Sequence, residues 1–454
     1  MNAAIRSSWR GNECANELER DQGEMWGNTR QVWALLLGVT ILALGHGLHG
    51  SLIGIRSAAE NFDTTTTGFI MSGYSLGLIL SAYLTPHLVK YVGHIRVFAA
   101  FASIVSTAVL LIPLWIDPLF WFAMRFVAGV CTSGLYIVAE SWLNEAASNK
   151  NRGKLLSIYM TLTFGAMGCG QLLLNITDES GFARFIAVSA LVSLALVPIS
   201  LMRSEPPNIE SARGVSVRDI YRASPLATVA VFTNGLGQSA FFSMGAVFGI
   251  TVGLSLPYIS LMMALPPLAV ILSQYPLGAL SDRFDRRAML TGLSLLAAGL
   301  CAIAIPAAAV SPFALIGIIA AFGAIALPIY SLVLAYANDH LSKDQMLGAS
   351  SKLILVYGIG AILGPLLAGG FMRQFGSSGF MIYMFLVYGG TGAFALFRTL
   401  RRPAVPREAG PVVQVSPVTT AVTAKALADD MSQDDGQVKS DAASVRPAAA
   451  SRTP

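Results

Sequence analysis

The sequence predicts an all-α polytopic membrane protein in which twelve transmembrane helices form two pseudo-symmetric six-helix bundles. The first reason is composition: 54% of the residues are hydrophobic and 12% are charged, against about a quarter charged in ordinary soluble domains. The second is an internal duplication, the usual basis of a transporter whose halves move around a central site. Identical or chemically similar residues recur at a spacing of 194 residues in the two halves: Pro118 and Pro312, Gly129 and Gly323, Tyr136 and Tyr330, Asn144 and Asn338, Glu145 and Asp339, Gly170 and Gly364.

Each predicted helix is an apolar run of about 20 residues, which is long enough to cross roughly 30 Å of hydrocarbon. Glycine, proline and serine within these runs are common in membrane helices, where neighbouring helices satisfy freed backbone groups. In chain order the runs are 32–55, 66–89, 96–115, 118–143, 154–176, 182–202, 225–252, 256–280, 288–309, 312–337, 348–371 and 379–399.

The distribution of lysine and arginine predicts the orientation, because short loops rich in these residues stay in the cytoplasm. The loops after the second, fourth, sixth, eighth and tenth runs carry most of the charge, whereas the opposite loops offer only Arg56, Arg184 and Arg373. We therefore expect a multi-pass protein of the plasma (inner) membrane with both termini cytoplasmic. The same distribution explains the net charge of +5 and argues against a nucleic-acid-binding surface.

The pattern divides the chain into five parts. Residues 1–30 are a polar cytoplasmic segment without the apolar core of a cleaved signal peptide. Residues 31–203 and 225–399 are the two six-helix bundles, and the charged, proline-containing stretch 204–224 is a cytoplasmic linker. Residues 400–454 lack aromatic side chains and are predicted to be a disordered cytoplasmic tail, either regulatory or dispensable.

Catalytic and metal signatures are missing from the sequence. The four cysteines have neither disulfide nor zinc spacing, and there is no P-loop, HExxH or nucleophile elbow in a plausible context. We expect no enzyme activity, no cofactor, no metal and no ATP-driven pumping by this chain alone.

The strongest local motif lies between the eighth and ninth runs, from Gly278 to Arg287. Gly278 permits close helix contact, Asp282 can approach the positive end of a helix from the other half, and Arg283, Arg286 and Arg287 can bind carboxylates or lipid phosphates. The motif is interpreted as a cytoplasmic gate, with a tight positive-inside turn as the alternative.

This motif resembles the Gly-x-x-x-Asp-Arg-x-Gly-Arg-Arg signature of the major facilitator superfamily, with Asp285 in place of the second glycine. The copy between the second and third runs is poorer, because Lys90 stands at the aspartate position and is followed by Gly93 and Arg96. A lysine is disfavoured at the N-terminus of a facing helix. Lys90 is expected to pair instead with an acidic residue such as Glu140, Glu145 or Asp339.

The fourth and fifth runs resemble the YcaD-like branch of that superfamily. The residues that carry this resemblance are Arg125 to Gly129, Glu140-Ser141, Asn151 to Leu156, Tyr159-Met160 and Gly170 to Leu173. The resemblance implies a secondary transporter, a symporter or an antiporter, that moves a small solute by alternating access. Glu140 and Arg152 are further candidates for the cytoplasmic gate. The fifth run has Gln171 where antiporters of the superfamily often have proline, which weakens a drug efflux interpretation.

Arg125 is the most costly residue in the chain, since an arginine at the centre of a membrane helix carries a penalty of about 3 kcal/mol on insertion scales. Arg125, Gly129, Thr132, Tyr136 and Glu140 fall within roughly 80° of one helix face. That face is predicted to line a water-accessible cavity. A structural arginine bonded to carbonyls is the alternative.

His46 and His49 lie on one side of the first run, at a depth similar to that of Arg125. Histidine titrates near neutral pH, and the middle of this run has no carboxylate to carry a proton. One of the two is therefore a candidate proton-coupling group. Each is equally explained as a packed histidine bonded to a carbonyl.

Other polar groups interrupt the apolar runs and are candidates for the substrate cavity or for ordinary interhelical hydrogen bonds. With Arg125 as the clear mid-membrane charge, they favour a polar or anionic solute. Besides a transporter, the sequence leaves open a membrane sensor with the same fold and, less well supported, a membrane enzyme. One chain holds both halves, so a monomer suffices. The additional cavity candidates are Tyr74, Tyr136, Gln171, Asn234, Gln238, Gln274, Tyr330 and Tyr357.

Overall fold

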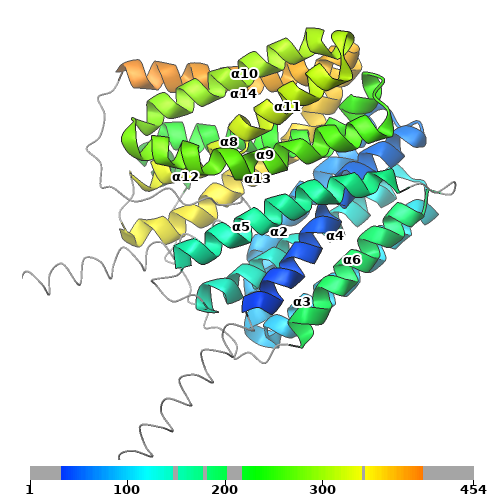
Figure 1. Cartoon of the computed structure of the whole chain (residues 1–454). Helices are drawn as coiled ribbons and strands as arrows, with labels where there is room; N and C mark the ends of the chain where they lie inside the picture. Colours follow the sequence, from blue (N-terminus) through cyan, green and yellow to red (C-terminus); the bar gives the residue numbers. More distant parts are fainter. Residues whose placement is uncertain (1–31, 147–151, 177–180, 202–216, 340–342, 402–454) are drawn as a thin grey trace, which may run out of the picture.

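The computed structural model describes residues 32–146, 152–176, 181–201, 217–339 and 343–401. These residues form long helices in two groups (Figure 1). The N-terminal group contains the helix Val32–Ala59, α2 (Thr64–Val92), α3 (His94–Leu111), α4 (Pro118–Ala146), α5 (Arg152–Leu172) and α6 (Ala183–Ser200). After the short α7 (Val217–Ala223), the C-terminal group contains α8 (Pro225–Thr251), α9 (Leu256–Arg283), α10 (Arg286–Val310), α11 (Pro312–Ala326), α12 (Ile329–Asn338), α13 (Lys343–Phe375) and α14 (Gly379–Arg401).

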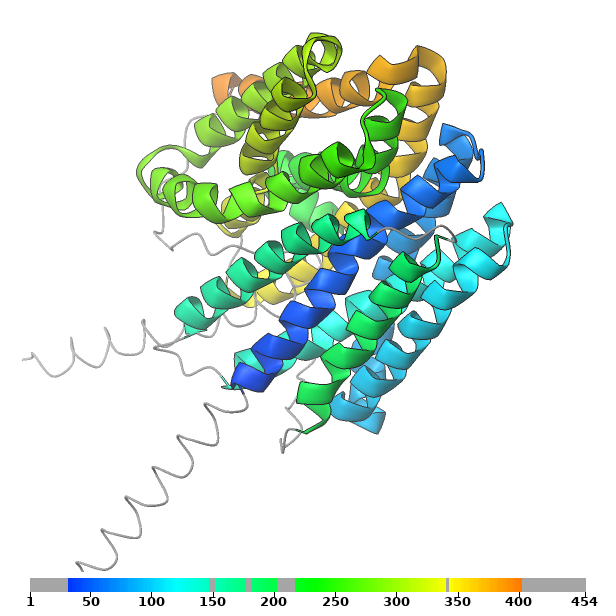
Figure 2. The same cartoon turned by 45° about the vertical axis from the view of Figure 1, so that its right-hand side comes forward.

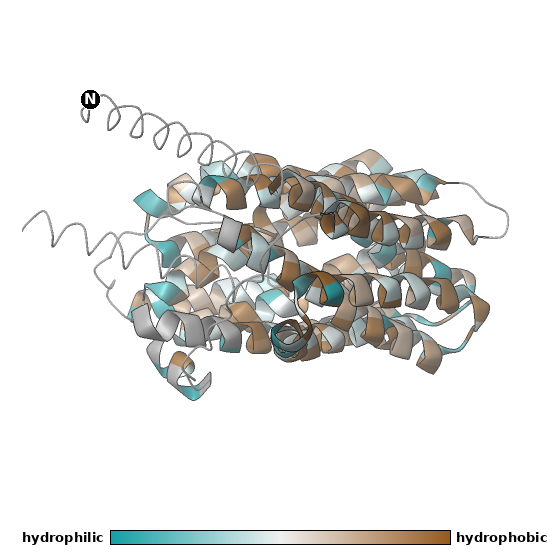
Figure 3. Ribbon diagram, turned by 90° about the horizontal axis from the view of Figure 1, so that it is seen from below, coloured by the Kyte–Doolittle hydropathy of each residue, from teal (hydrophilic) through white to brown (hydrophobic). Residues whose placement is uncertain are grey.

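Within the described residues, each of the twelve predicted runs corresponds to helical structure. Ten stretches are long and apolar enough to span a membrane, and the last of them, Lys352–Arg401, includes both α14 and most of α13. The remaining long helix, α8, carries Thr233, Asn234, Gln238 and Ser239 near its middle. Figure 3 shows the apolar residues along the lengths of the helices. The all-α membrane fold predicted from the sequence is thus confirmed.

Proline 328 divides one predicted run. The run 312–337 forms two helices, α11 and α12, because a proline has no backbone N–H and its ring clashes with the carbonyl four residues earlier. The break exposes the Leu327 carbonyl oxygen, which accepts a hydrogen bond of 3.0 Å from the Gln238 side chain. A backbone irregularity is tolerated at membrane depth where another part of the protein satisfies it.

The structure describes only part of the predicted linker and termini. The end of the predicted linker is helical, since α7 occupies residues 217–223, and Ser224 precedes α8 directly. The segment 1–30, most of the linker and the tail from residue 402 lie outside the described residues. Their organisation stays a prediction.

The duplication predicted from the sequence is repeated in the helix packing. A Cβ atom at Gly129 of α4 would lie 2.2 Å from the Tyr74 carbonyl oxygen of α2, and one at Gly323 of α11 would lie 2.3 Å from Pro266 of α9. Likewise, Gly170 of α5 abuts the Leu44 carbonyl of the first helix, and Gly364 of α13 abuts the Leu236 carbonyl of α8. Equivalent helices therefore touch through equivalent glycines in both halves.

The two halves contact each other through α2 against α13 and α5 against α9. The Thr64 hydroxyl donates to the Gly369 carbonyl at 2.9 Å, and the Asn175 amide donates to the Ser260 hydroxyl at 2.9 Å. Both hydrogen bonds lie toward the end of the molecule that carries the Ala59–Thr64 turn. Figure 2 shows the two groups of helices coming together at this end.

Candidate binding cavity

A cavity of about 160 Å³ lies between the two halves. Its wall comes from the first helix, α2, α4 and α5 on one side and from α8, α12 and α13 on the other, together with Leu327 at the break before α12. A buried water needs roughly 10–15 Å³ of such volume, so the cavity has room for about ten to fifteen non-hydrogen atoms. It is lined by His46, Gly47, Gly50, Tyr74, Ser75, Leu78, Arg125, Tyr136, Tyr159, Met160, Thr163, Phe164, Met167, Gln171, Gln238, Ser239, Phe242, Ser243, Leu327, Tyr330, Tyr357 and Ala361.

Arg125 supplies the permanent charge of this wall. Its side chain is 4% exposed, and its Cζ atom lies 4.8 Å from the centre of the Tyr74 ring. Its Nε atom is buried and has no hydrogen-bond partner within the described residues. A desolvated cation over a tyrosine face gains about 2 kcal/mol, which offsets part of its burial cost but leaves its hydrogen-bonding capacity unused. No Asp or Glu occurs among the described residues that line the cavity.

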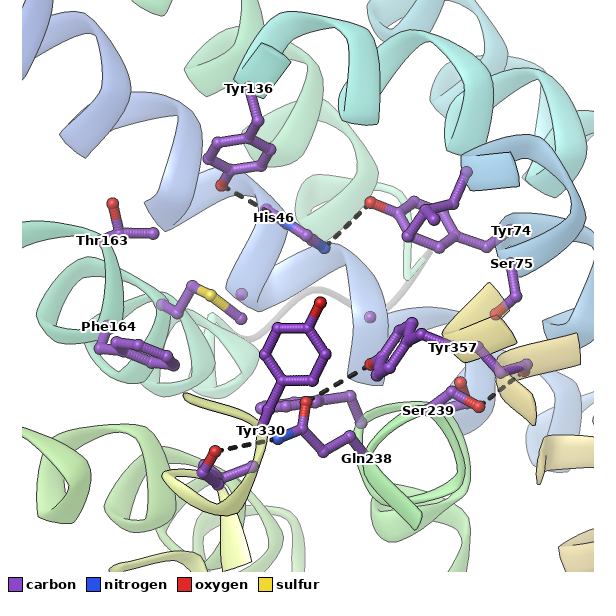
Figure 4. Close-up of a pocket in the computed structure, with 18 of the residues that line it drawn as sticks. His46, Tyr74, Ser75, Tyr136, Thr163, Phe164, Gln238, Ser239, Tyr330 and Tyr357 are labelled. Carbon is purple, nitrogen blue, oxygen red and sulfur yellow. Dashed lines mark hydrogen bonds between the residues drawn. The ribbon is translucent and has the colours of Figure 1, made fainter. Parts of the chain in front are cut away.

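His46 is held between two tyrosine hydroxyl groups (Figure 4). Its Nδ1 atom lies 3.3 Å from the Tyr136 hydroxyl, and its Nε2 atom lies 3.3 Å from the Tyr74 hydroxyl. A neutral imidazole donates from one nitrogen and accepts at the other, whereas the protonated ring donates from both. Because a hydroxyl both donates and accepts, His46 keeps both partners in either protonation state.

The wall contributed by the C-terminal half is neutral. The Gln238 amide donates to Leu327, and its Oε1 atom accepts from the Tyr357 hydroxyl at 3.4 Å. The rings of Tyr330 and Tyr357 meet edge to face, with centroids 5.3 Å apart. Figure 4 shows these side chains opposite His46 and Tyr74.

The structure brings most of the predicted cavity residues together and leaves three aside. Arg125, His46, Tyr74, Tyr136, Gln171, Gln238, Tyr330 and Tyr357 line the cavity. His49 and Asn234 do not line it and are each 2% exposed. Gln274 lines a separate, smaller cavity of about 30 Å³ with Gly278 and Ser281. Gln274 was misplaced because polarity alone does not tell which helix face meets the other half.

Several lining residues were missed as cavity candidates. On α5, Tyr159, Thr163 and Met167 lie on the same face as Gln171, each four residues from the next. That spacing places side chains on one helix face and would have identified the whole stripe. The apolar contributors Phe164 and Phe242 carry no sequence signal that separates them from ordinary core residues.

The predicted gate residues make contacts within their own halves. In the C-terminal half Arg286 pairs with Asp339, and Asp282 lies 3.7 Å from Arg286. Asp285 caps α10 by accepting from the Arg287 N–H at 2.9 Å, and its carboxylate also pairs with the Arg287 guanidinium. This cap explains why aspartate stands at the glycine position. The equivalent Gly93 has a φ of 90°, which favours glycine.

The N-terminal gate candidates lie in different surroundings. Glu140 accepts a hydrogen bond of 2.5 Å from the Tyr159 hydroxyl. Lys90 and Arg96 are exposed, and within the described residues Lys90 forms no ion pair with Glu140 or Asp339. Arg283 is also exposed. The side chains of Glu145 and Arg152 lie outside the described part of the chain.

A family model described as Major Facilitator Superfamily matches this sequence twice, over residues 35–257 and 227–430. The MFS-type transporter YcaD of Escherichia fergusonii is 27% identical over 350 residues, which cover 76% of this chain and 90% of that protein. The resemblance drawn from the fourth and fifth runs is thereby confirmed.

Solved structures share the fold. The nucleoside transporter NupG has a TM-score of 0.69 at 11% identity, over 83% of this chain and 99% of that one. A bacterial homologue of the human lysosomal transporter Spinster, in an inward-facing and unoccupied conformation, has a TM-score of 0.62 at 16% identity, over 89% of this chain and 98% of that one. At these identities the likeness concerns the fold alone.

Proposed function

This chain belongs to the Major Facilitator Superfamily, and from that premise we propose that it is a secondary transporter that moves a small anionic solute by alternating access. Membrane transport is the function for which its relatives are named. That the solute is an anion is inferred from the residues that line the cavity.

The observation that supports an anionic solute is the environment of Arg125. This buried guanidinium lines the cavity with an unused Nε donor and no acidic neighbour among the described lining residues. A planar guanidinium presents several N–H donors in a fork that matches a carboxylate or phosphate. An anion beside Arg125 would compensate the charge and take up the unused donors.

We also propose that the transport is coupled to protons through the histidine pair. His46 is the stronger candidate, since its hydrogen bonds to Tyr74 and Tyr136 accommodate both protonation states. The Nε2 atom of His49 is buried without a partner within the described residues. The proposed location is the plasma (inner) membrane with both termini cytoplasmic, which rests on the arginine and lysine distribution. The proposed state is a monomer, because one chain holds both halves.

The test is solute flux into proteoliposomes. Wild type, Arg125→Gln and Arg222→Ala are reconstituted, supplied with a mixed pool of anionic, neutral and cationic metabolites, and assayed with and without a proton gradient. Arg222 is an exposed cation on α7 and serves as the matched control. We expect one or more anions to accumulate in wild type and Arg222→Ala and uptake to fall at least about tenfold in Arg125→Gln, the usual scale for losing a buried charge partner.

Two results would contradict the proposal. Anion uptake that is unchanged in folded Arg125→Gln would remove Arg125 from the solute site. The absence of flux for every solute in folded wild-type protein would instead favour a sensor that uses the same fold.

A further inference from the structure

The charge balance of the cavity points to a single negative charge on the solute, an inference that rests on the proposed function. Arg125 is the one permanently charged residue among the described residues that line the cavity. The buried Glu140 lies fifteen residues further along α4, which corresponds to about 22 Å of helix. While His46 is neutral, a dianion would leave one charge uncompensated in a desolvated site, and such a charge costs several kcal/mol. A neutral or cationic solute would leave Arg125 without compensation.

The hydrogen-bond donors of the wall are largely committed to the protein itself. The Ser239 hydroxyl donates to the Ala361 carbonyl at 2.6 Å, and the Thr163 hydroxyl donates to the Tyr159 carbonyl at 2.8 Å. The Tyr357 hydroxyl donates to Gln238, whose own amide donates to Leu327. A solute with many hydroxyl groups, such as a sugar, would find few free donors here and would lose its hydration without replacement.

The remaining wall is aromatic and apolar. Tyr330 and Tyr357 form an edge-to-face pair, and Phe164, Phe242, Met160 and Met167 continue the surface. Aromatic rings pack on one another in stacked or edge-to-face arrangements that are favourable beyond the area they bury. Tyrosine faces also attract cations, but the charge of Arg125 disfavours a cation in the same cavity.

From these three features together we propose that the solute is a small aromatic monocarboxylate, with its carboxylate on Arg125 and its ring against Tyr330 and Tyr357. The volume of about 160 Å³ accommodates a single ring with one head group. The N-terminal half then holds the charge, and the C-terminal half recognises the flat apolar body.

The test compares four probes of similar size in binding to the purified protein. Labelled benzoate is displaced by cyclohexanecarboxylate, which lacks the aromatic ring, by benzamide, which lacks the charge, and by phthalate, which has a second charge. Binding is measured rather than flux, because the protonated acid crosses bilayers unaided. We expect saturable benzoate binding and a preference over cyclohexanecarboxylate of about 2- to 12-fold, the range of one aromatic pair. Benzamide and phthalate should be weaker than benzoate by more than about tenfold.

Variants separate the two recognition elements. Arg125→Gln should abolish benzoate binding. Tyr357→Leu should remove the preference over cyclohexanecarboxylate, whereas Tyr357→Phe keeps the ring and should retain it. The competition among the four probes uses wild-type protein alone. It therefore tests the proposal even if a variant fails to fold.

The outcomes distinguish this inference from the proposed function. Equal competition by cyclohexanecarboxylate would overturn the aromatic assignment, and stronger competition by phthalate would overturn the single charge. If benzoate fails to bind while uptake of another anion still depends on Arg125, the aromatic monocarboxylate is wrong and the anion transporter stands. If no anion binds or moves in an Arg125-dependent way, both fail.

Discussion

His46 occupies a position in which a proton can be gained or lost without rearranging its neighbours. Tyr74 and Tyr136 hold its two nitrogens at 3.3 Å each, and reversal of a hydroxyl adapts either bond to a change in charge. We predict that His46→Gln abolishes the gradient dependence of uptake, because glutamine preserves hydrogen bonding but cannot carry a proton. Uptake with and without an imposed proton gradient measures this effect. His49→Gln is the comparison, and retained gradient dependence in the double variant would rule out the histidine pair.

Asp63 acts as the N-cap of α2. The Thr66 N–H donates a hydrogen bond to the Asp63 carboxylate, and so do the Thr66 hydroxyl and the Thr65 N–H. These bonds and the positive charge of Arg373 favour the ionised carboxylate. The pKa of Asp63 is therefore lowered, although slight burial acts to raise it. A lowered pKa in the folded state means that the ionised cap stabilises the fold above the unfolded pKa and that this contribution is lost as pH falls through the folded pKa.

Replacing this cap should therefore destabilise the protein in a pH-dependent way. Asp63→Ala should cost about 1 kcal/mol near neutral pH, and the difference from wild type should shrink in acid. Asp63→Asn keeps a capping oxygen without the charge, so its stability should lie between those of wild type and Asp63→Ala. Thermal unfolding of the three proteins in detergent across acidic and neutral pH measures this, and equal Tm values for Asp63→Ala and wild type at neutral pH would contradict it.

At the scale of the helix, α11 offers a matched pair of glycines. A Cβ atom at Gly323 would lie 2.3 Å from Pro266 Cβ of α9, whereas one at Gly317 would meet nothing within 4 Å. We predict that Gly323→Ala destabilises the protein by about 1–3 kcal/mol, because the helices must separate or shift, and that Gly317→Ala does not. Detergent thermal unfolding compares them directly. A Tm for Gly323→Ala at or above that of Gly317→Ala would show that the α9–α11 contact adapts.

The same elements show what the sequence could and could not predict. Length and apolarity located the helices, and the 194-residue spacing located the paired glycines, because both are properties of the chain itself. The cavity depends on which helix faces meet across the two halves. Arg125 and Tyr136 were found because a polar stripe is costly in a membrane. Gln274 was misplaced and Phe242 missed because neither polarity nor apolarity specifies which face of a membrane helix meets the other half.

For the whole molecule, alternating access requires that the contacts between the halves at the Thr64–Gly369 end separate during transport. Asn175 and Ser260 lie across this contact, with a side-chain hydrogen bond of 2.9 Å. We predict that the variant Asn175→Cys with Ser260→Cys forms a disulfide on oxidation and that this disulfide stops flux, because the halves can no longer separate there. Reduction should restore transport. Proteoliposome flux before and after oxidation measures the effect.

A second cysteine pair controls for oxidation and for cross-linking itself. Ser106 and Ser189 of α3 and α6 lie 2.6 Å apart at their hydroxyl oxygens but within the N-terminal half. If each half moves as a rigid body, Ser106→Cys with Ser189→Cys should also form a disulfide and yet keep its flux. Both pairs are made with Cys14 and the exposed Cys169 replaced by serine, which leaves the buried Cys131 and Cys301. Unchanged flux with the Asn175–Ser260 pair fully cross-linked would mean that this end stays closed throughout transport, and the solute would then need a route that does not pass between α5 and α9.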